Sequence, residues 1–128
     1  MGMKHLISAM TMAMLALAVM VKLPQEVTAD GKPLPAGSYE IRVTEQRPAL
    51  PSGEPNETQR WVEFVSNGVV VGREIAEVFP ASERPVGTAG ANAVVQTLKG
   101  GEFLRVSFNE RSARYLIHFP VGAARGPQ

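Results

Sequence analysis

Two glutamates and a tryptophan come nearest to a recognisable chemical site in this sequence. Glu63 and Glu74 flank an Asn67-Gly68 pair, which predicts a tight hairpin turn because a type I′ turn needs positive φ at both central positions. A two-residue loop there places Glu63, Glu74 and Trp61 on one face. Paired carboxylates beside an aromatic ring could bind or cleave a sugar. The competing interpretation, favoured by strand alternation alone, is a solvated sheet face whose acids pair with arginines.

The same turn predicts an apolar patch on that face. Val65 and Val70 lie beside Trp61, and Glu63 and Glu74 form a polar rim around them. An exposed apolar patch is either covered by a loop or used to contact a partner. We therefore take Trp61, Val65, Val70, Glu63 and Glu74 as candidate interface residues.

Other catalytic and metal chemistry finds little support in the residue types. The chain has no Cys, which excludes disulfides, zinc–thiolate sites, iron–sulfur clusters and thiol nucleophiles. His118 is the only histidine beyond the N-terminal segment, and a catalytic histidine needs an orienting partner. No Gly-x-Ser-x-Gly motif is present. We predict a protein that is not an enzyme and has no catalytic residues, cofactor or metal.

Composition and charge narrow the class of partner. The 128 residues are 45% hydrophobic and 20% charged, which is ordinary for one globular domain. Thirteen Lys and Arg against twelve Asp and Glu give a formal net charge of +1. Nucleic-acid binding needs a clear basic excess, so no nucleic-acid partner is predicted.

The elements that must position these residues are strands. From Val19 onward the hydrophobic pattern has period two, most clearly in residues 38–44, where Tyr39, Ile41 and Val43 share one face. No later segment shows helical periodicity. We predict an all-β fold of six to seven antiparallel strands in hairpins, forming a small sandwich or a partly closed barrel. One N-terminal hydrophobic helix precedes it.

Around Asn67-Gly68 the predicted register is specific. It sets Phe64 opposite Val71 and Val62 opposite Arg73. The face that carries Phe64, Val69 and Val71 is then the buried one.

Two further turns extend the sheet. A loop at Gly100-Gly101 pairs Val95 with Val106, and a turn at Glu110-Arg111 pairs Val106 with Tyr115. In each pairing the apolar residues of the two strands fall on the same face. The positions of the turns and the hydrophobic alternation therefore agree, which supports the predicted registers.

The remaining segments are a short turn and three irregular stretches. Asp30-Gly31 is predicted to be a turn. The long segments Glu45–Arg60 and Ala81–Ala91 are either functional or mobile. Residues 121–128 are predicted to be a flexible tail.

The first eighteen residues have the layout of a secretory signal. A basic start precedes an apolar stretch, and Ala16-Leu17-Ala18 predicts cleavage before Val19, with Val27-Thr28-Ala29 as a second site. If uncleaved, residues 6–23 are marginal for a spanning helix of about 17–25 residues. Residues 19–120 would form the β-domain in both cases. It is predicted to be periplasmic or extracellular, or tethered to the inner membrane if the segment is retained.

Three stretches resemble a family of small uncharacterised exported all-β proteins of environmental bacteria. They are residues 31–43 (GKPLPAGSYEIRV), 60–80 (RWVEFVSNGVVVGREIAEVFP) and 98–120, which holds LKGGEFLRVSF and RYLIHFP. The shared features are a Leu-Pro-Ala-Gly-x-Tyr turn and a Trp-Val-Glu-Phe strand. The resemblance implies export and an all-β fold, and it carries no established activity.

Three functions follow as hypotheses. The first is a non-enzymatic exported β-domain that acts as an accessory or structural subunit of a membrane-associated assembly, such as a respiratory or photosynthetic complex. Its partner would be a protein. The second is a free periplasmic binding module for a small apolar or sugar ligand, held within the fold or under the 45–60 segment. The third is a carbohydrate-active enzyme using Glu63 and Glu74.

Overall fold

The protein is described by a computed structural model that covers residues 18–80, 93–110 and 112–122. These residues form nine strands and one short 3₁₀ helix. In chain order they are β1 (Val19–Leu23), β2 (Val27–Ala29), β3 (Lys32–Leu34), β4 (Gly37–Val43), β5 (Gln59–Ser66), β6 (Val69–Pro80), β7 (Val94–Leu98), η2 (Lys99–Gly101), β8 (Phe103–Glu110) and β9 (Ala113–Pro120). The predicted N-terminal helix, the 81–91 segment and tail residues 123–128 lie outside the described residues.

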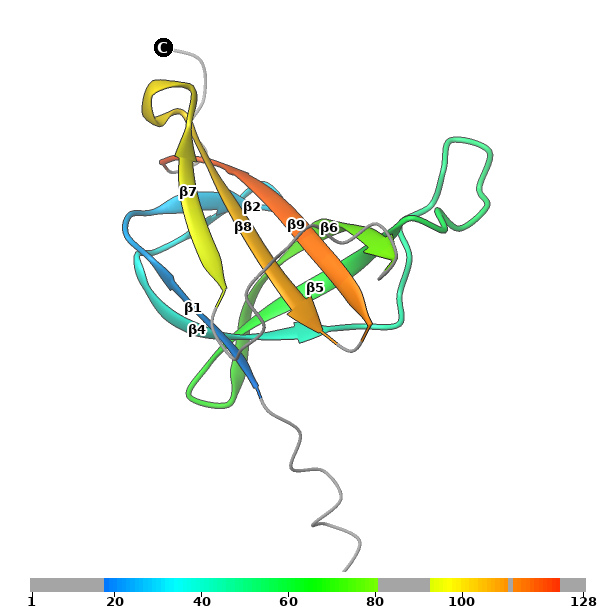
Figure 1. Cartoon of the computed structure of the whole chain (residues 1–128), viewed down its shortest axis with the longest axis horizontal. Coiled ribbons are helices and arrows are strands. Elements are labelled where there is room, and N and C mark those ends of the chain that lie inside the picture. Colours follow the sequence, from blue (N-terminus) through cyan, green and yellow to red (C-terminus); the bar gives the residue numbers. More distant parts are fainter. Residues whose placement is uncertain (1–17, 81–92, 111, 123–128) are drawn as a thin grey trace, which may run out of the picture.

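Seven strands form one antiparallel sheet in the order β1-β4-β5-β6-β9-β8-β7. The sheet curls until β7 comes beside β1 (Figure 1). There the N–H of Ala93 donates to the carbonyl of Met20 at 2.8 Å, so the sheet is nearly closed. The all-β prediction, with antiparallel strands in hairpins, is therefore confirmed, and the strands are more numerous than the six to seven expected.

A second sheet, the β2–β3 hairpin, covers one end of the first. β6 pairs with β9 only from Glu77 onward, so the earlier part of β6 and the later part of β9 lie apart. The hairpin fills this gap: Val27 bridges to Val121 beyond β9, and the Leu34 side chain lies against Gly72 of β6. Val27 and Leu34 are both fully buried, so the hairpin contributes directly to the core.

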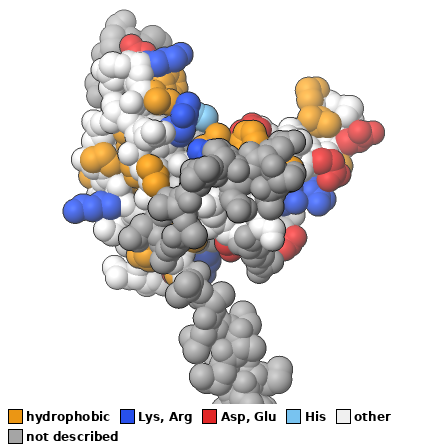
Figure 2. Space-filling view, viewed as in Figure 1, with side chains coloured by type: hydrophobic (Ala, Val, Ile, Leu, Met, Phe, Trp, Pro, Cys, Tyr) orange, Lys and Arg blue, Asp and Glu red, His pale blue; other side chains and the backbone are white. Residues whose placement is uncertain are grey.

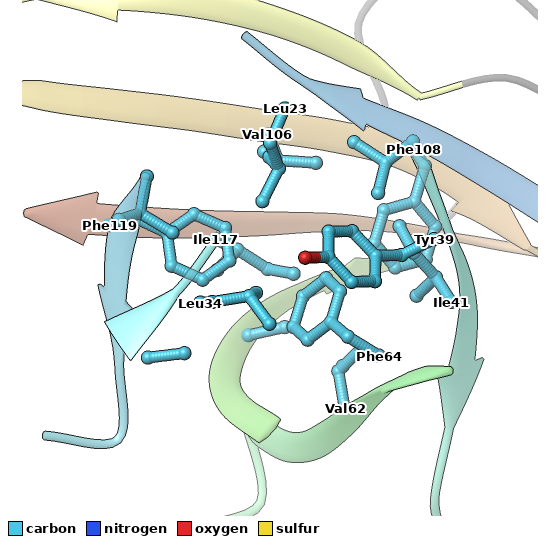
Figure 3. Packing of buried hydrophobic residues seen from close by; sticks show 14 of the residues in the cluster. Leu23, Leu34, Tyr39, Ile41, Val62, Phe64, Val106, Phe108, Ile117 and Phe119 are labelled. Atoms are coloured by element: carbon cyan, nitrogen blue, oxygen red, sulfur yellow. The ribbon is translucent and has the colours of Figure 1, made fainter. Parts of the chain in front are cut away.

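The core lies inside the curled sheet (Figure 3), where side chains from both sheets point toward one another. Phe64 is at its centre, with ring centroids 5.5 Å from Phe119 and 6.4 Å from Tyr39. Phe108 and Tyr115 stack at 5.1 Å. Each fully buried side chain of this size contributes about 1.5–3 kcal/mol. A chain without cysteines depends on this core for its stability.

The predicted turns at Asn67-Gly68 and Asp30-Gly31 are both confirmed, with positive φ at all four residues. The register beyond the first turn is wrong by one residue. Val65 pairs with Val70 as expected, but Phe64 then pairs with Gly72, which leaves Val71 as a β-bulge. A bulge inserts one unpaired residue and so reverses the face of every later side chain in its strand. Val69 and Val71, predicted to be buried, are exposed.

The C-terminal strands follow the predicted faces. Val95 pairs with Val106 as predicted. The β8–β9 register is wrong by two residues, because Val106 pairs with Ile117 and Tyr115 pairs with Phe108. The turn lies between Glu110 and Ala113 rather than at 110–111. A slip of two leaves side-chain faces unchanged, so Val106, Ile117 and Tyr115 are still buried together.

The first two residues of the predicted tail belong to the folded domain. The N–H of Val121 donates to Glu102 at 2.9 Å, and the N–H of Gly122 donates to Glu26 at 2.7 Å. The Thr28 hydroxyl donates to the carbonyl of Gly122 at 2.8 Å. The two bonds of Gly122 hold β2 and the residue before it to the end of β9.

Candidate functional site

Trp61 lies half-buried on the outer face of β5, and a cation covers its ring. The Arg73 guanidinium stands 3.9 Å from the ring centroid. Nε of the same arginine lies 3.0 Å from Oδ2 of Asp30. A cation over an indole at a partly exposed site contributes about 0.5–1 kcal/mol. The ring of Trp61 is therefore partly shielded by the protein itself.

Val65 does not form part of an exposed patch. It pairs with Val70, so both side chains lie on the outer face, as predicted. Val65 is only 2% exposed, however, whereas Val70 is 47% exposed. Of the two valines expected to form an exposed apolar surface beside Trp61, only Val70 is exposed. Alternation along a strand predicts the face on which a side chain lies, but it does not show whether other groups cover that side chain.

Glu74 is not on the face of Trp61 and Glu63. The bulge at Val71 pairs Glu74 with buried Val62, whereas Glu63 pairs with Arg73. The two carboxylates therefore project from opposite faces of the sheet. The prediction that Glu63 and Glu74 share one face is therefore wrong, and their placement gives no support to a carbohydrate-active enzyme built on this pair, whose acid and base must flank one substrate bond.

The Glu74 carboxylate instead closes the end of the gap between β6 and the β2–β3 hairpin. Its Oε1 accepts the N–H of Asp30 at 2.7 Å, and its Oε2 accepts the N–H of Ile75 at 3.0 Å. One side chain thereby joins the hairpin turn to the strand.

Glu63 lies in a ladder of alternating charge. Arg42 of β4 and Arg73 of β6 are its direct cross-strand partners. Opposite charges on neighbouring strands stabilise one another modestly. This arrangement agrees with the interpretation of a solvated sheet face.

Three consecutive valines at the start of β6 form the main exposed apolar tract among the described residues. Val69, Val70 and Val71 are 60%, 47% and 46% exposed. Sequence reasoning placed two of them in the core. A signal was present: Gly72 follows them, and a glycine inside a strand pattern often marks a bulge or a close backbone approach.

The backbone edge beside these valines lacks a strand partner. The N–H of Trp61 donates to Gln46 at 2.9 Å, and its carbonyl accepts the N–H of Thr44 at 3.0 Å, so both groups point away from β6. Its cross-strand partner Ile75 must then present its backbone to the opposite edge of β6. Alternation places the N–H and carbonyl of Arg73 on that edge too.

No strand of the described chain pairs with that edge before Glu77. What faces it is a groove of about 250 Å³ between β3 and β6. The groove is lined by residues of the β2–β3 hairpin and of β6: Ala29, Asp30, Lys32, Pro33, Val70, Val71, Gly72 and Arg73.

A second recess, of about 410 Å³ and open to solvent, lies beside Trp61 under the segment 45–58. It is lined by Glu45, Gln46, Arg47, Pro55 and Trp61. The segment projects from the curled sheet (Figure 1). In Figure 2 the tip of this projection is apolar, with charged side chains beside it. Leu50 is exposed there. An antiparallel β-bridge between Ala49 and Pro55 folds the segment back on itself, so the segment has a defined conformation.

The remaining polar candidates have structural partners. Nε2 of His118 accepts a hydrogen bond from Arg105 at 3.3 Å on the outer face. The Tyr39 hydroxyl donates to the Pro35 carbonyl at 2.6 Å, and burial raises the pKa of that phenol. Within the described ranges, no three acidic or histidine side chains converge as a metal site would require.

Comparisons with protein-family models, with curated proteins and with solved structures found no match for this chain. None of the helices in the described part of the chain is long and apolar enough to span a membrane.

Proposed function

We propose that this protein is a non-enzymatic, exported β-domain that serves as an accessory subunit of a membrane-associated assembly, with a respiratory or photosynthetic complex as one setting. The observation that carries this proposal is the exposed tract Val69–Val71 on an unpaired strand edge. Natural proteins usually blunt or cover such edges, because they pair readily with other chains. A tract that no other described residue covers suits a protein that is covered in its assembly.

Two features of the outer face support a role in contact rather than catalysis. The carboxylates of Glu63 and Glu74 lie on opposite faces, and Glu74 is engaged with backbone N–H groups. The Trp61 ring is held by Arg73. Glu74 and Trp61 are thus engaged within the fold, whereas the side chains of Val69, Val70 and Val71 are about half exposed.

The burial of β1 supports export by a cleaved signal. Val19, Val21 and Leu23 are core residues, so they cannot also belong to a helix in a membrane. The apolar stretch left before them runs from Leu6 to Ala18. About 13 residues is the length of a signal-peptide core and is short of the roughly 17–25 that span a bilayer.

The buried hairpin also favours one cleavage site over the other. Cleavage after Ala29 would remove β1 and β2, whose Val27 and Ala29 are in the core. Cleavage before Val19 keeps the whole sheet. The intact mass of the protein recovered from the native host is therefore expected to correspond to a chain that begins at Val19. A chain that keeps Met1 would contradict a cleaved signal.

Assembly is tested by native fractionation of solubilised membranes. We expect the protein to migrate with a larger complex, and Val70→Glu to shift it to the free fraction without unfolding it. Val94→Glu is the matched control, because Val94 is a valine of similar exposure (43%) on β7. A protein that never migrates above its own mass would contradict the proposal, as would equal loss in both variants.

The recess beside Trp61 favours a second candidate, a periplasmic binding module for a small apolar or sugar ligand. It is open to solvent and joins an aromatic ring to the polar side chains of Glu45, Gln46 and Arg47, a combination that suits a sugar at the surface. Because Trp61 is the only tryptophan in the chain and lines this recess, its fluorescence can report ligand binding there. A saturable change on titration with a neutral oligosaccharide, abolished by Arg47→Ala, would support this second function.

A further inference from the structure

The predicted signal cleavage site lies at the first residue of a core strand. Ala18 is exposed, whereas Val19, the next residue, is only 6% exposed and begins β1. Val19 pairs with Ile41 of β4 and packs within the hydrophobic core. The folded domain therefore begins directly at the bond that a signal peptidase would cut, with no spacer residue after that bond.

The strand that starts there is held at both edges. All five residues of β1 pair with β4. From the other edge, the carbonyl of Met20 accepts the N–H of Ala93 at 2.8 Å. Val21 and Leu23 are buried in the core. A terminal strand that is bonded and packed in this way is tied down and does not behave as a frayed end.

This placement protects the bond from a protease once the domain has folded. A protease binds an extended segment of several residues around the bond that it cuts, so Val19 and Met20 would have to leave the sheet together. Their departure breaks the backbone bonds of β1 and exposes its core side chains to water. Such an opening is a partial unfolding event, and cleavage then follows the small population of the open form.

We propose that signal peptidase cuts the Ala18–Val19 bond before the domain folds, and that folding closes the cleavage site. The inference rests on the cleaved signal of the proposed function, and it names the order of processing and folding. Hydrolysis consumes one water and leaves a carboxylate on Ala18 and an α-amino group on Val19. The chain would accordingly cross the membrane unfolded. A chain that folds first would keep its first eighteen residues.

The test compares two precursors that share the same junction. The full 128-residue chain is purified uncut and folded from cells in which it is not exported. The Val106→Asp precursor is the unfolded counterpart, because the new carboxylate is buried in β8. Each is incubated with a purified bacterial signal peptidase in detergent micelles, where circular dichroism reports its fold and mass spectrometry reports cleavage. We expect the folded precursor to be cut at least about 100-fold more slowly.

A spacer variant separates protection by the fold from a poor junction sequence. Insertion of Val-Met-Gly-Ser-Gly-Ser after Ala18 keeps the two residues that follow the bond and moves the bond up to about 20 Å from β1. This folded precursor should be cut within about threefold of the rate of its Val106→Asp version. The same insertion after Gly53, in an exposed turn, is the matched control and should leave the folded precursor protected.

Two results would overturn the proposed order. One is a folded precursor that is cut as fast as the Val106→Asp precursor. The other is a folded spacer variant that is cut no faster than the folded parent while its unfolded version is cut rapidly, because the fold would then not be the cause of protection.

Failure of this inference and failure of the proposed function are distinguishable. If the native protein begins at Val19 but the folded precursor is cut rapidly, the cleaved signal stands and the order is wrong. If the native protein keeps Met1 while the folded precursor is protected, the cleaved signal is wrong and the closure of the site by folding stands. Migration with a membrane complex tests the accessory role separately from both.

Discussion

The contact between Gly72 and Leu34 gives the sharpest test of how the β2–β3 hairpin is held. A Cβ built on Gly72 would lie 3.1 Å from Cδ1 of Leu34 and 3.9 Å from Cδ2 and Cγ. The Gly72 backbone does not need positive φ, so the effect of a substitution is steric. We expect Gly72→Val to lower the free energy of unfolding by about 1–3 kcal/mol, as overpacked cores do.

A double-mutant cycle separates this collision from a general effect on the strand. Leu34 is fully buried, so Leu34→Ala alone should cost about 2–5 kcal/mol. In the double variant the new valine occupies space that Leu34 has left. The combined loss should therefore be smaller than the sum of the single losses by about 1–3 kcal/mol.

The assay is urea unfolding, with equal m-values required for comparison. Gln96→Val, at an exposed strand position, is the control for adding a β-branched residue and should change stability by no more than about 0.5 kcal/mol. Additive losses in the cycle, or an unchanged Gly72→Val protein, would refute the packing of β3 on β6.

Three further predictions concern the turn, the core and a buried phenol. Gly68→Val should cost about 1–3 kcal/mol, because φ is +81° there; unchanged melting would place the turn elsewhere. Val106→Asp should prevent folding by burying an unpaired carboxylate, whereas Arg105→Ala on the outer face should cost about 0.5 kcal/mol or less; circular dichroism of both variants checks the register. Burial raises the pKa of Tyr39, so its neutral form stabilises the fold below about pH 10 and this contribution is lost as pH rises further. Alkaline unfolding of Tyr39→Phe should therefore begin at higher pH than that of the wild type.

Side-chain faces could be predicted from the sequence wherever alternation alone decides them. In β4, Tyr39 and Ile41 are buried as expected. In β8 and β9, Val106 and Ile117 lie in the core even though the predicted register was wrong by two residues. A register shift of two residues leaves every side chain on the same face of the strand, so the alternating hydrophobic pattern does not distinguish the two registers.

The β5–β6 hairpin shows where such reasoning fails. Its turn and first pair were predicted correctly, and one extra residue at Val71 reversed everything beyond. At the bulge, Gly72 lies against Leu34, a residue outside the hairpin. A contact between segments about forty residues apart is not encoded in local periodicity. The placement of Glu74 on the face opposite Glu63 follows directly from the extra residue at Val71.

The bulge also explains why the candidate surface is an edge rather than a face. With regular pairing, Glu74 would have joined Trp61 and Glu63 on the outer face. On the opposite face, the Glu74 carboxylate accepts hydrogen bonds from the N–H groups of Ile75 and Asp30. It thereby joins the turn of the β2–β3 hairpin to β6. From there toward Val69, no strand of the described chain pairs with the edge of β6 that faces away from β5. The bulge that accompanies the packing of β2–β3 on β6 therefore also leaves the side chains of Val69, Val70 and Val71 exposed beside that contact.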